Sequence, residues 1–198
     1  MTTLKEVLID QLRDLLHAET QLTNALPKMS QAAKNARLKE AFEKHLDQTR
    51  VHVERLNRAF EFLGEDAKPK PCRAMIGLIE EGEETIQEAA KMDPVCGDLA
   101  LIAAAQRVEH YEISAYGTAR GLARQIGENE CARLLSHTLG DEESTDFLLT
   151  SISDPLLQQA ALNDMNANVD LNRVRKQERE TQSARGRGTS EKVGRGAA

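Results

Sequence analysis

The sequence is poor in aromatic residues. Tryptophan is absent and aromatic residues make up 3% of the 198 positions, although hydrophobic residues reach 40%. A hydrophobic core must therefore be built from leucine, alanine, isoleucine and valine. This mixture favours packed helices over a β-sandwich, which relies on aromatic and β-branched side chains. We expect an all-α protein.

Cysteine is also scarce, and its spacing shows no pairing. The three cysteines are Cys72, Cys96 and Cys131, and no CxxC pair occurs. A structural disulfide or a thiolate metal site needs paired spacing that these positions lack. We interpret them as free thiols in a reducing compartment and expect a cytoplasmic protein.

Long hydrophobic runs and an excess of positive charge are missing as well. No segment approaches the length that spans a bilayer, and the first residues carry charge from Lys5 onward, unlike a secretory signal. The formal net charge is −6. We therefore expect neither a membrane nor a nucleic acid to be the main partner.

Apolar residues recur in steps of three and four, which is typical of amphipathic helices. A shorter, acidic helix is expected within "RAMIGLIEEGEETIQEAAKM", in the connection between two helical hairpins. Pro27 is expected to bend or interrupt the first helix near its end. Together the pattern predicts a four-helix bundle with a long crossover. The four long helices are expected over residues 3–29, 37–63, 95–126 and 129–153.

The C-terminal part differs in composition from the bundle. Asp154-Pro155 is expected to open one more helix, which ends near Arg175. Beyond it the chain is rich in Arg, Gly and Ser, which predicts disorder. We expect a bundle over 1–160, a helical extension over 161–176 and a disordered tail over 177–198. DNA protection by the tail is an alternative role that truncation after Arg175 would test.

Every long helix has ionisable residues on its apolar face. An isolated buried carboxylate costs several kcal/mol, so several in one core must be neutralised. Equal numbers of residues separate Glu19 from His52 and Glu109 from Glu142, so antiparallel hairpins bring each pair to a common height. Two divalent cations would neutralise such a cluster and use its oxygens and nitrogens as ligands. The candidate metal ligands are Glu19, His45, His52, Glu109, Glu112, Glu142 and Asp146.

Simpler interpretations stay open for several of these residues. Glu112 and Asp146 lie near the edges of their apolar stripes, where a solvated position is the alternative. His45 and His52 have the alternative of ordinary hydrogen-bonded core histidines. His110 points about 100° away from Glu109 around the helix. We expect it either at the surface or in contact with a metal ligand, and not bound to the metal itself.

Four segments resemble the YciF-type ferritin-like stress proteins of bacteria: "LLHAETQL", "HLDQTRVHVERL", "LIAAAQRVEHYEISAYGTARGLARQIG" and "LLSHTLGDEESTDFLL". The resemblance covers residues 4–155. It implies a rubrerythrin-like four-helix bundle, a homodimer, a dimetal centre and a role in stress responses. The matching site positions are Glu19, His45, Glu109, Glu112, Glu142 and Asp146.

One position departs from the family pattern, which has Glu where this chain has Gln48. A glutamine can ligate through its carbonyl, but it brings no charge and bridges poorly. We expect a weaker or asymmetric site, with His52 as a compensating nitrogen ligand.

The expected cofactor is a pair of iron ions, with manganese as the alternative. Peroxide or dioxygen is the expected small-molecule substrate, because hard oxygen ligands stabilise the ferric product. Any enzymatic activity would then be of the di-iron oxidase or peroxidase type. The rival hypothesis is a metal-free helical stress protein that binds a partner and has no catalytic activity.

Overall fold

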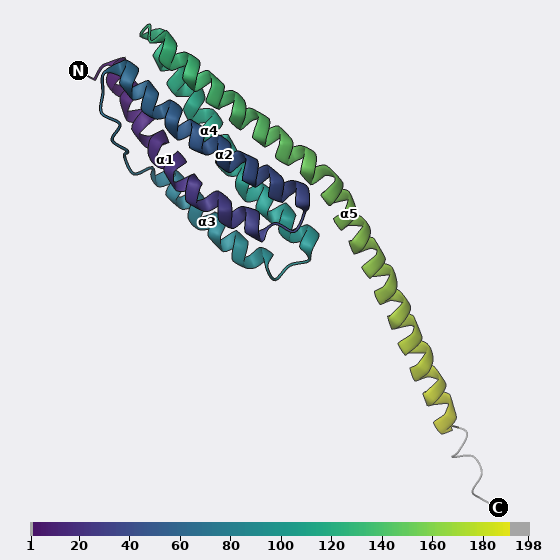
Figure 1. Ribbon diagram of the computed structural model, residues 1–198. Coiled ribbons are helices and arrows are strands. Elements are labelled where there is room, and N and C mark those ends of the chain that lie inside the picture. The colour runs from purple at the N-terminus through teal and green to yellow at the C-terminus, as the bar shows by residue number, and fades with distance from the viewer. Residues whose placement is uncertain (1, 191–198) are drawn as a thin grey trace, which may run out of the picture. The chain divides into compact units, whose positions relative to one another are not determined.

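The chain forms a bundle of long helices in the computed structural model, which describes residues 2–190 (Figure 1). No β-strand occurs among the described residues, which confirms the all-α prediction. None of the described helices is both long and apolar enough to cross a membrane. The helices are α1 (Leu4–Ala32), α2 (Ala36–Leu63), α3 (Arg73–Ala89), α4 (Pro94–Gln125) and α5 (Asn129–Ser190).

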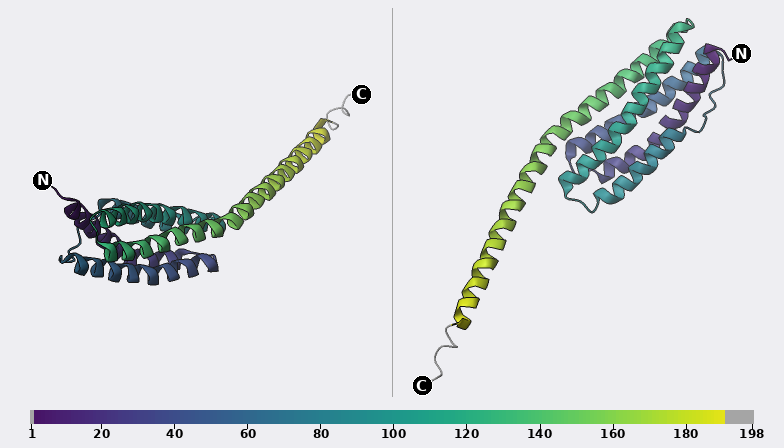
Figure 2. Two further views of the ribbon diagram at one scale, coloured as in Figure 1. Left: turned by 90° about the horizontal axis from the view of Figure 1, so that it is seen from above. Right: turned by 180° about the vertical axis from the view of Figure 1, so that it is seen from behind.

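The compact bundle extends to Leu156. Within it, α1 and α2 form one antiparallel hairpin, and α4 with the first part of α5 forms the other (Figures 1 and 2). The crossover between the hairpins contains α3, which packs against α1 and α4. This is the predicted four-helix bundle with a short helix in its long connection.

Local sequence signals explain where the helices begin and end. Thr3 and Glu6 form a capping box at the start of α1. Asp93 accepts a hydrogen bond from the backbone of Val95, and Pro94 occupies the first turn of α4. Gly64 ends α2 with φ 68°, a left-handed conformation that glycine adopts without strain.

A buried carboxylate fixes the turn between α1 and α2 against α4. Asp98 is 3% exposed, and its two oxygens accept hydrogen bonds from the backbone N–H groups of Lys34 and Asn35 at 2.8 and 2.7 Å. This buried acid is therefore fully satisfied by the backbone. The contact sets the height of the first hairpin relative to α4.

The hydrophobic core of the bundle is divided into two clusters. One lies towards the α1–α2 turn and includes Leu22, Leu26, Phe42, Leu101, Ile102 and Leu149. The other lies towards the opposite end and includes Leu8, Leu12, Leu56, Phe60, Leu135 and Leu139. Along each long helix the inward ionisable residues, with the exception of Asp98, fall between these two sets. A polar layer therefore crosses the middle of the bundle.

Neither internal proline ends its helix. α1 continues through Pro27 to Ala32, so Pro27 does not interrupt it, and the new helix expected to open at Asp154-Pro155 is wrong because α5 continues through Pro155. Both Ile152 and Leu156 are buried, so packing on either side of Pro155 favours one continuous helix over the local signal.

The C-terminal segment beyond the bundle is described as part of α5. This helix extends to Ser190, where we expected disorder from residue 177. Gln, Glu and Arg make up most of residues 177–182, and all three favour a helix. Residues 191–198 of the expected tail lie outside the described residues. The domain limits at 160 and 176 stay predictions.

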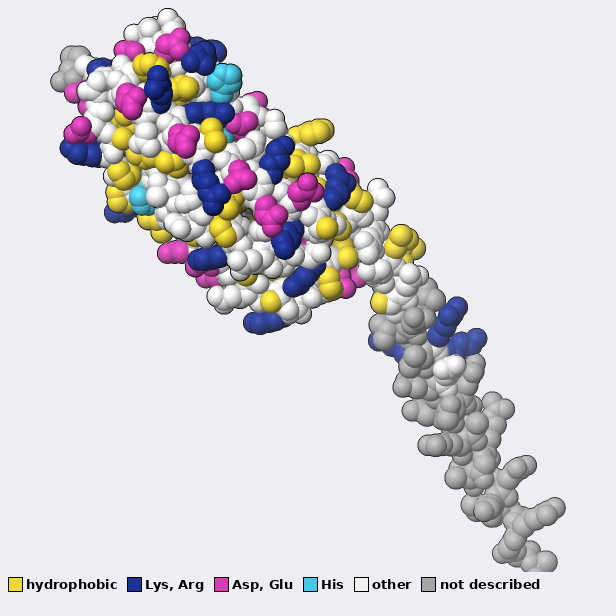
Figure 3. All heavy atoms as spheres, in the orientation of Figure 1, with side chains coloured by type: hydrophobic (Ala, Val, Ile, Leu, Met, Phe, Trp, Pro, Cys, Tyr) yellow, Lys and Arg dark blue, Asp and Glu magenta, His cyan; other side chains and the backbone are white. Residues whose placement is uncertain are grey.

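The surface of the bundle is mixed in charge. On the face drawn in Figure 3, acidic and basic side chains are interspersed over the helices. Such a mixture produces no extended field of one sign on that face.

Candidate metal centre

Six of the seven predicted ligands come together in the polar layer. They are contributed by all four long helices, and none has more than 2% of its surface exposed. Their side chains point inward because each occupies the apolar stripe of its helix. The six are Glu19 on α1, His45 and His52 on α2, Glu109 and Glu112 on α4, and Glu142 on α5.

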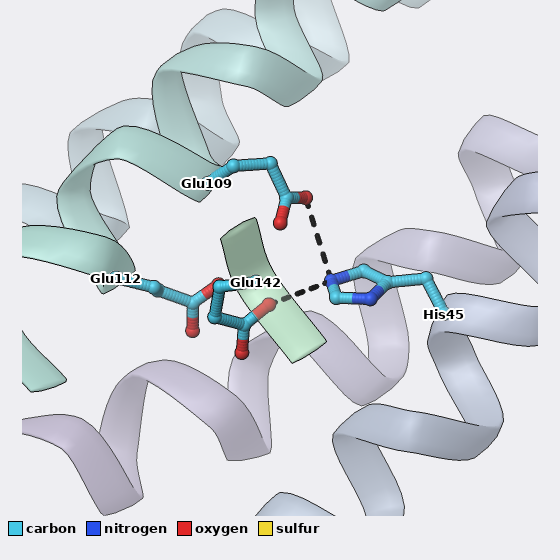
Figure 4. A group of neighbouring side chains, drawn as sticks. All are labelled: His45, Glu109, Glu112 and Glu142. Atoms are coloured by element: carbon cyan, nitrogen blue, oxygen red, sulfur yellow. Dashed lines mark ion pairs between the residues drawn. The ribbon is translucent and has the colours of Figure 1, made fainter. Parts of the chain in front are cut away.

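The first ligand group consists of His45, Glu109, Glu112 and Glu142, each offering an atom within 4.8 Å of the others. The His45 ring directs Nε2 at two carboxylates (Figure 4). Nε2 lies 3.4 Å from Oε1 of Glu109 and 3.5 Å from Oε2 of Glu142. Three acids and one imidazole therefore face a common point.

The second ligand group consists of Glu19, His52 and Glu142, again with ligand atoms within 4.8 Å. Nδ1 of His52 lies 3.3 Å from Oε1 of Glu19 and 3.0 Å from Oε1 of Glu142. Glu142 thus belongs to both groups, with Oε2 near His45 and Oε1 near His52. A carboxylate placed in this way could offer one oxygen to each of two ions.

Burial dominates the protonation of the acids. It raises the pKa of Glu109 well above the ordinary value, and the charge of Glu142 adds to the effect. Burial, followed by the charges of Glu19 and Glu142, does the same to the pKa of Glu112. The pKa of Glu19 is also raised by burial, although His52 opposes this. The cluster therefore disfavours several negative charges unless cations accompany them.

Many polar atoms of the cluster lack a hydrogen-bond partner, whereas buried polar atoms in proteins are normally paired. The unpaired atoms are Oε2 of Glu19, Oε2 of Glu109, both carboxylate oxygens of Glu112 and of Glu142, and Nδ1 of His52. Ligands held at about 2.1 Å from one ion lie roughly 3.0–3.5 Å apart, as these pairs do. Four carboxylates also balance two divalent ions in charge. The donor set fits a pair of such ions.

An ion pair that the sequence did not reveal holds His52 in place. Asp141 accepts a hydrogen bond from Arg55 Nη1 at 2.6 Å and one from the Gln48 amide at 3.4 Å. Its Oδ2 lies 3.3 Å from Nε2 of His52. Burial alone would raise the pKa of Asp141, but the Arg55 hydrogen bond brings it below its ordinary value. A carboxylate on Nε2 orients the ring so that Nδ1 faces Glu19 and Glu142.

His45 is oriented by a hydroxyl group instead. Oγ1 of Thr145 donates to the backbone carbonyl of Asp141 at 3.0 Å and lies 3.1 Å from Nδ1 of His45. An N–H at Nδ1 can donate to this oxygen, which leaves the Nε2 lone pair towards the acids. Burial lowers the pKa of His45, which favours this neutral ring. Neither Thr145 nor Asp141 carried a signal in the helical pattern that separated it from a surface residue.

Asp146 lies outside both groups. Its Oδ1 accepts a hydrogen bond from Gln106 at 2.9 Å and lies 3.4 Å from Nε2 of the exposed His110. This is the solvated rim position that the sequence left open. Gln48 also stays outside the groups and contacts Asp141, while His52 lies within the second group. Tyr116, fully buried, donates a hydrogen bond to Oε1 of Glu19.

Comparison with known proteins agrees with this fold. A family model described as "Domain of unknown function (DUF892)" matches residues 3–162. Protein YciF of Escherichia coli (strain K12) is 44% identical over 154 residues, which are 77% of this chain and 92% of that protein. The crystal structure of the E. coli stress protein YciF matches with a TM-score of 0.76 and 42% identity, over 80% of this chain and 99% of that one.

A more distant structural match concerns the fold alone. The dodecameric thioferritin of Bacteroides fragilis, a bacterioferritin-related protein, matches with a TM-score of 0.57 at 16% identity, over 82% of this chain and 90% of that one. The bundle is accordingly ferritin-like. The sequence match, the structural match and the family model all cover about four fifths of the chain. The chain therefore belongs to the DUF892 family and is a ferritin-like homologue of the stress protein YciF.

Proposed function

We propose that the two ligand groups bind a pair of divalent metal ions, iron or alternatively manganese, and that the protein uses them to react with peroxide or dioxygen during stress. One observation carries this proposal. Buried carboxylate oxygens from three helices converge without hydrogen-bond partners, and Glu142 directs one oxygen to each group. Two divalent cations are the simplest partners that satisfy all of them.

The chemistry of the donor set supports iron or manganese. Carboxylate oxygens with one imidazole per ion suit both Fe(II) and Mn(II), and thiolates that would favour softer ions are absent from both groups. Bound iron would supply the electrons for reduction of peroxide or dioxygen. The chain itself orients the ligands, through Asp141 on His52, Thr145 on His45 and Tyr116 on Glu19. The apolar clusters on both sides keep bulk water from the layer.

The biological setting is part of the same proposal. E. coli YciF is described as a stress protein, and a centre that consumes peroxide or dioxygen would fit oxidative stress. We propose an oxidase or peroxidase type of activity, in the cytoplasm, in a homodimer. Light scattering of the purified chain would test the dimer.

Anaerobic titration with Fe(II) tests the metal centre. We expect two equivalents per chain, and peroxide should then produce the near-ultraviolet absorption of an oxo-bridged ferric pair. Glu142→Ala should lose both ions because it removes the shared ligand. Glu143→Ala is the matched control, since it removes the neighbouring exposed carboxylate on the same helix. A folded wild-type chain that takes up no metal would instead support the metal-free interaction protein.

A further inference from the structure

A second cluster of reactive side chains contains none of the candidate metal ligands. Its members are Cys72 at the start of α3, Tyr111 on α4 and Asp14 on α1. Cys72 is 1% exposed, whereas Tyr111 and Asp14 are partly buried. The connection between α2 and α3 passes along α1 (Figure 1), where the backbone N–H of Lys70 donates to the carbonyl of Arg13 at 3.0 Å. Three distant segments of the chain therefore meet around one thiol.

The hydrogen bonds of this cluster run in one direction. The Tyr111 hydroxyl donates to Oδ2 of Asp14 at 2.7 Å. Because this hydroxyl has a single proton, its oxygen acts as the acceptor towards Sγ of Cys72, which lies 3.0 Å away. Burial raises the pKa of the Cys72 thiol, so the thiol keeps the proton that this contact requires. The chain of hydrogen bonds runs from thiol to phenol to carboxylate.

Tyr111 connects this cluster to the candidate metal centre. It immediately precedes the candidate ligand Glu112 on α4. Cys72 is close enough to Glu112 to contribute, after burial and three acids, to the rise in the pKa of that ligand. The sequence has no tryptophan and two tyrosines. The other tyrosine, Tyr116, is fully buried and donates to Glu19, so Tyr111 is the oxidisable ring that solvent can reach.

We propose that Cys72, Tyr111 and Asp14 form an electron relay through which a soluble thiol reduces the candidate metal centre. The relay rests on the proposed reaction with peroxide, whose reduction to two waters consumes two electrons and two solvent protons. Where bound iron supplies one electron, Tyr111 supplies the other. Its phenolic O–H bond breaks, the proton moves to Oδ2 of Asp14, and a phenoxyl radical remains on Tyr111.

Cys72 then repairs Tyr111. Its thiol transfers a hydrogen atom to the phenoxyl oxygen, so the S–H bond breaks, the phenolic O–H bond forms again and a thiyl radical remains on Cys72. The transfer is nearly balanced in energy, because S–H and phenolic O–H bonds are similar in strength. A soluble thiol restores the pair by giving a hydrogen atom that passes through the partly exposed Tyr111 to Cys72. Asp14 releases its proton to solvent, and two radicals of the soluble thiol combine into a disulfide.

Pulse radiolysis of the full chain, freed of metal, tests the relay without the metal chemistry. Azide radicals remove one electron from tyrosine, and the absorption of the phenoxyl radical follows its lifetime. We expect this absorption in the wild-type chain and its loss in Tyr111→Phe. Cys72→Ser should lengthen the phenoxyl lifetime at least about tenfold, because the serine O–H bond is much stronger than S–H and raises the barrier to hydrogen transfer.

Two serine variants separate the relay from a purely structural role. Cys72→Ser keeps a hydroxyl that can cap α3 and donate to Tyr111, so the variant should fold. Cys131→Ser is the matched control, because Cys131 is also a buried free thiol but lies outside the cluster. It should leave the phenoxyl lifetime unchanged. A contact that served structure alone would give both variants the lifetime of the wild-type chain.

Equal phenoxyl lifetimes in Cys72→Ser and the wild-type chain overturn the relay, as does a phenoxyl signal that persists in Tyr111→Phe. Peroxide added to the Fe(II)-loaded Cys72→Ser variant should produce a tyrosyl radical, seen by electron paramagnetic resonance, that the wild-type chain does not accumulate. Equal lifetimes with normal iron uptake would overturn the relay alone. A chain that transfers the hydrogen atom but takes up no iron would overturn the proposed metal centre and, with it, the destination of the electron.

Discussion

The two ligand groups share Glu142, but they differ in the number of carboxylates and in the residue that orients the histidine. The first group has three carboxylates and His45, which contacts the neutral hydroxyl of Thr145. The second has two carboxylates and His52, whose ring faces Asp141, itself paired with Arg55. The comparison indicates that one side of the centre depends mainly on negative charge and the other on the fixed orientation of its histidine.

The two histidines also differ in protonation without metal. Burial lowers the pKa of His45. Burial acts in the same direction on His52, but the carboxylates of Glu142 and Glu19 close to its Nδ1 outweigh it and raise its pKa to about 10. A proton on His52 therefore compensates the acids of the second group. Among the acids of the first group, only the shared Glu142 contacts His52.

The largest expected effect is a loss of stability of the metal-free protein at high pH. Since the folded pKa of His52 is raised from 6.5 to about 10, its stabilising contribution is complete below about pH 6.5 and is lost as pH rises through 10. The change should be on the order of several kcal/mol. Urea unfolding between pH 6.5 and 10 measures it. His52→Gln should flatten the profile and the exposed His137→Gln should not; equal profiles would disprove the assignment.

Removing a ligand that belongs to only one group should weaken the binding of only one of the two ions. Glu112→Gln is expected to weaken only the first ion and Glu19→Gln only the second. Each loss should exceed the roughly 100-fold that an orienting residue contributes, because a charged ligand is lost outright. Titration with Mn(II), monitored by electron paramagnetic resonance, counts the ions that remain. Loss of both ions in either variant would show that the groups bind metal only as one unit.

The orienting residues should act on one group each. Asp141→Asn is expected to weaken the second ion about 10–100-fold, since the carboxylate that orients His52 loses its charge. Thr145→Val should weaken the first ion by less, about tenfold, because a neutral hydroxyl is removed. The same metal titrations measure both. If the two variants weakened the same ion, the proposed division between the groups would be wrong.

The smallest effect is expected for Asp146→Asn. This residue lies outside both groups and contacts Gln106 and His110 near the surface. Its replacement should change metal affinity by less than about twofold and the free energy of unfolding by less than about 0.5 kcal/mol. A loss of metal comparable to that of Glu112→Gln would place Asp146 in the centre after all.

Much of the candidate site could be predicted because helical periodicity indicates which side chains point into the bundle. Glu19, Glu109 and Glu142 stand in apolar stripes, and the equal spacing within the two hairpins predicts their common height. Periodicity failed for Asp146, which lies one turn after Glu142 but about 40° further around the helix. That angle is enough to move a carboxylate from the buried layer to the rim.

The sequence by itself determined the all-α class, the long helices and the inward acids, since these depend on contacts between neighbours a few residues apart. Only the tertiary structure decided that Glu142 serves both groups and that Asp141, 89 residues from His52, orients its ring. It also decided that α5 passes through Pro155. These features depend on the distances between helices, which the packing of distant segments sets and no local pattern encodes.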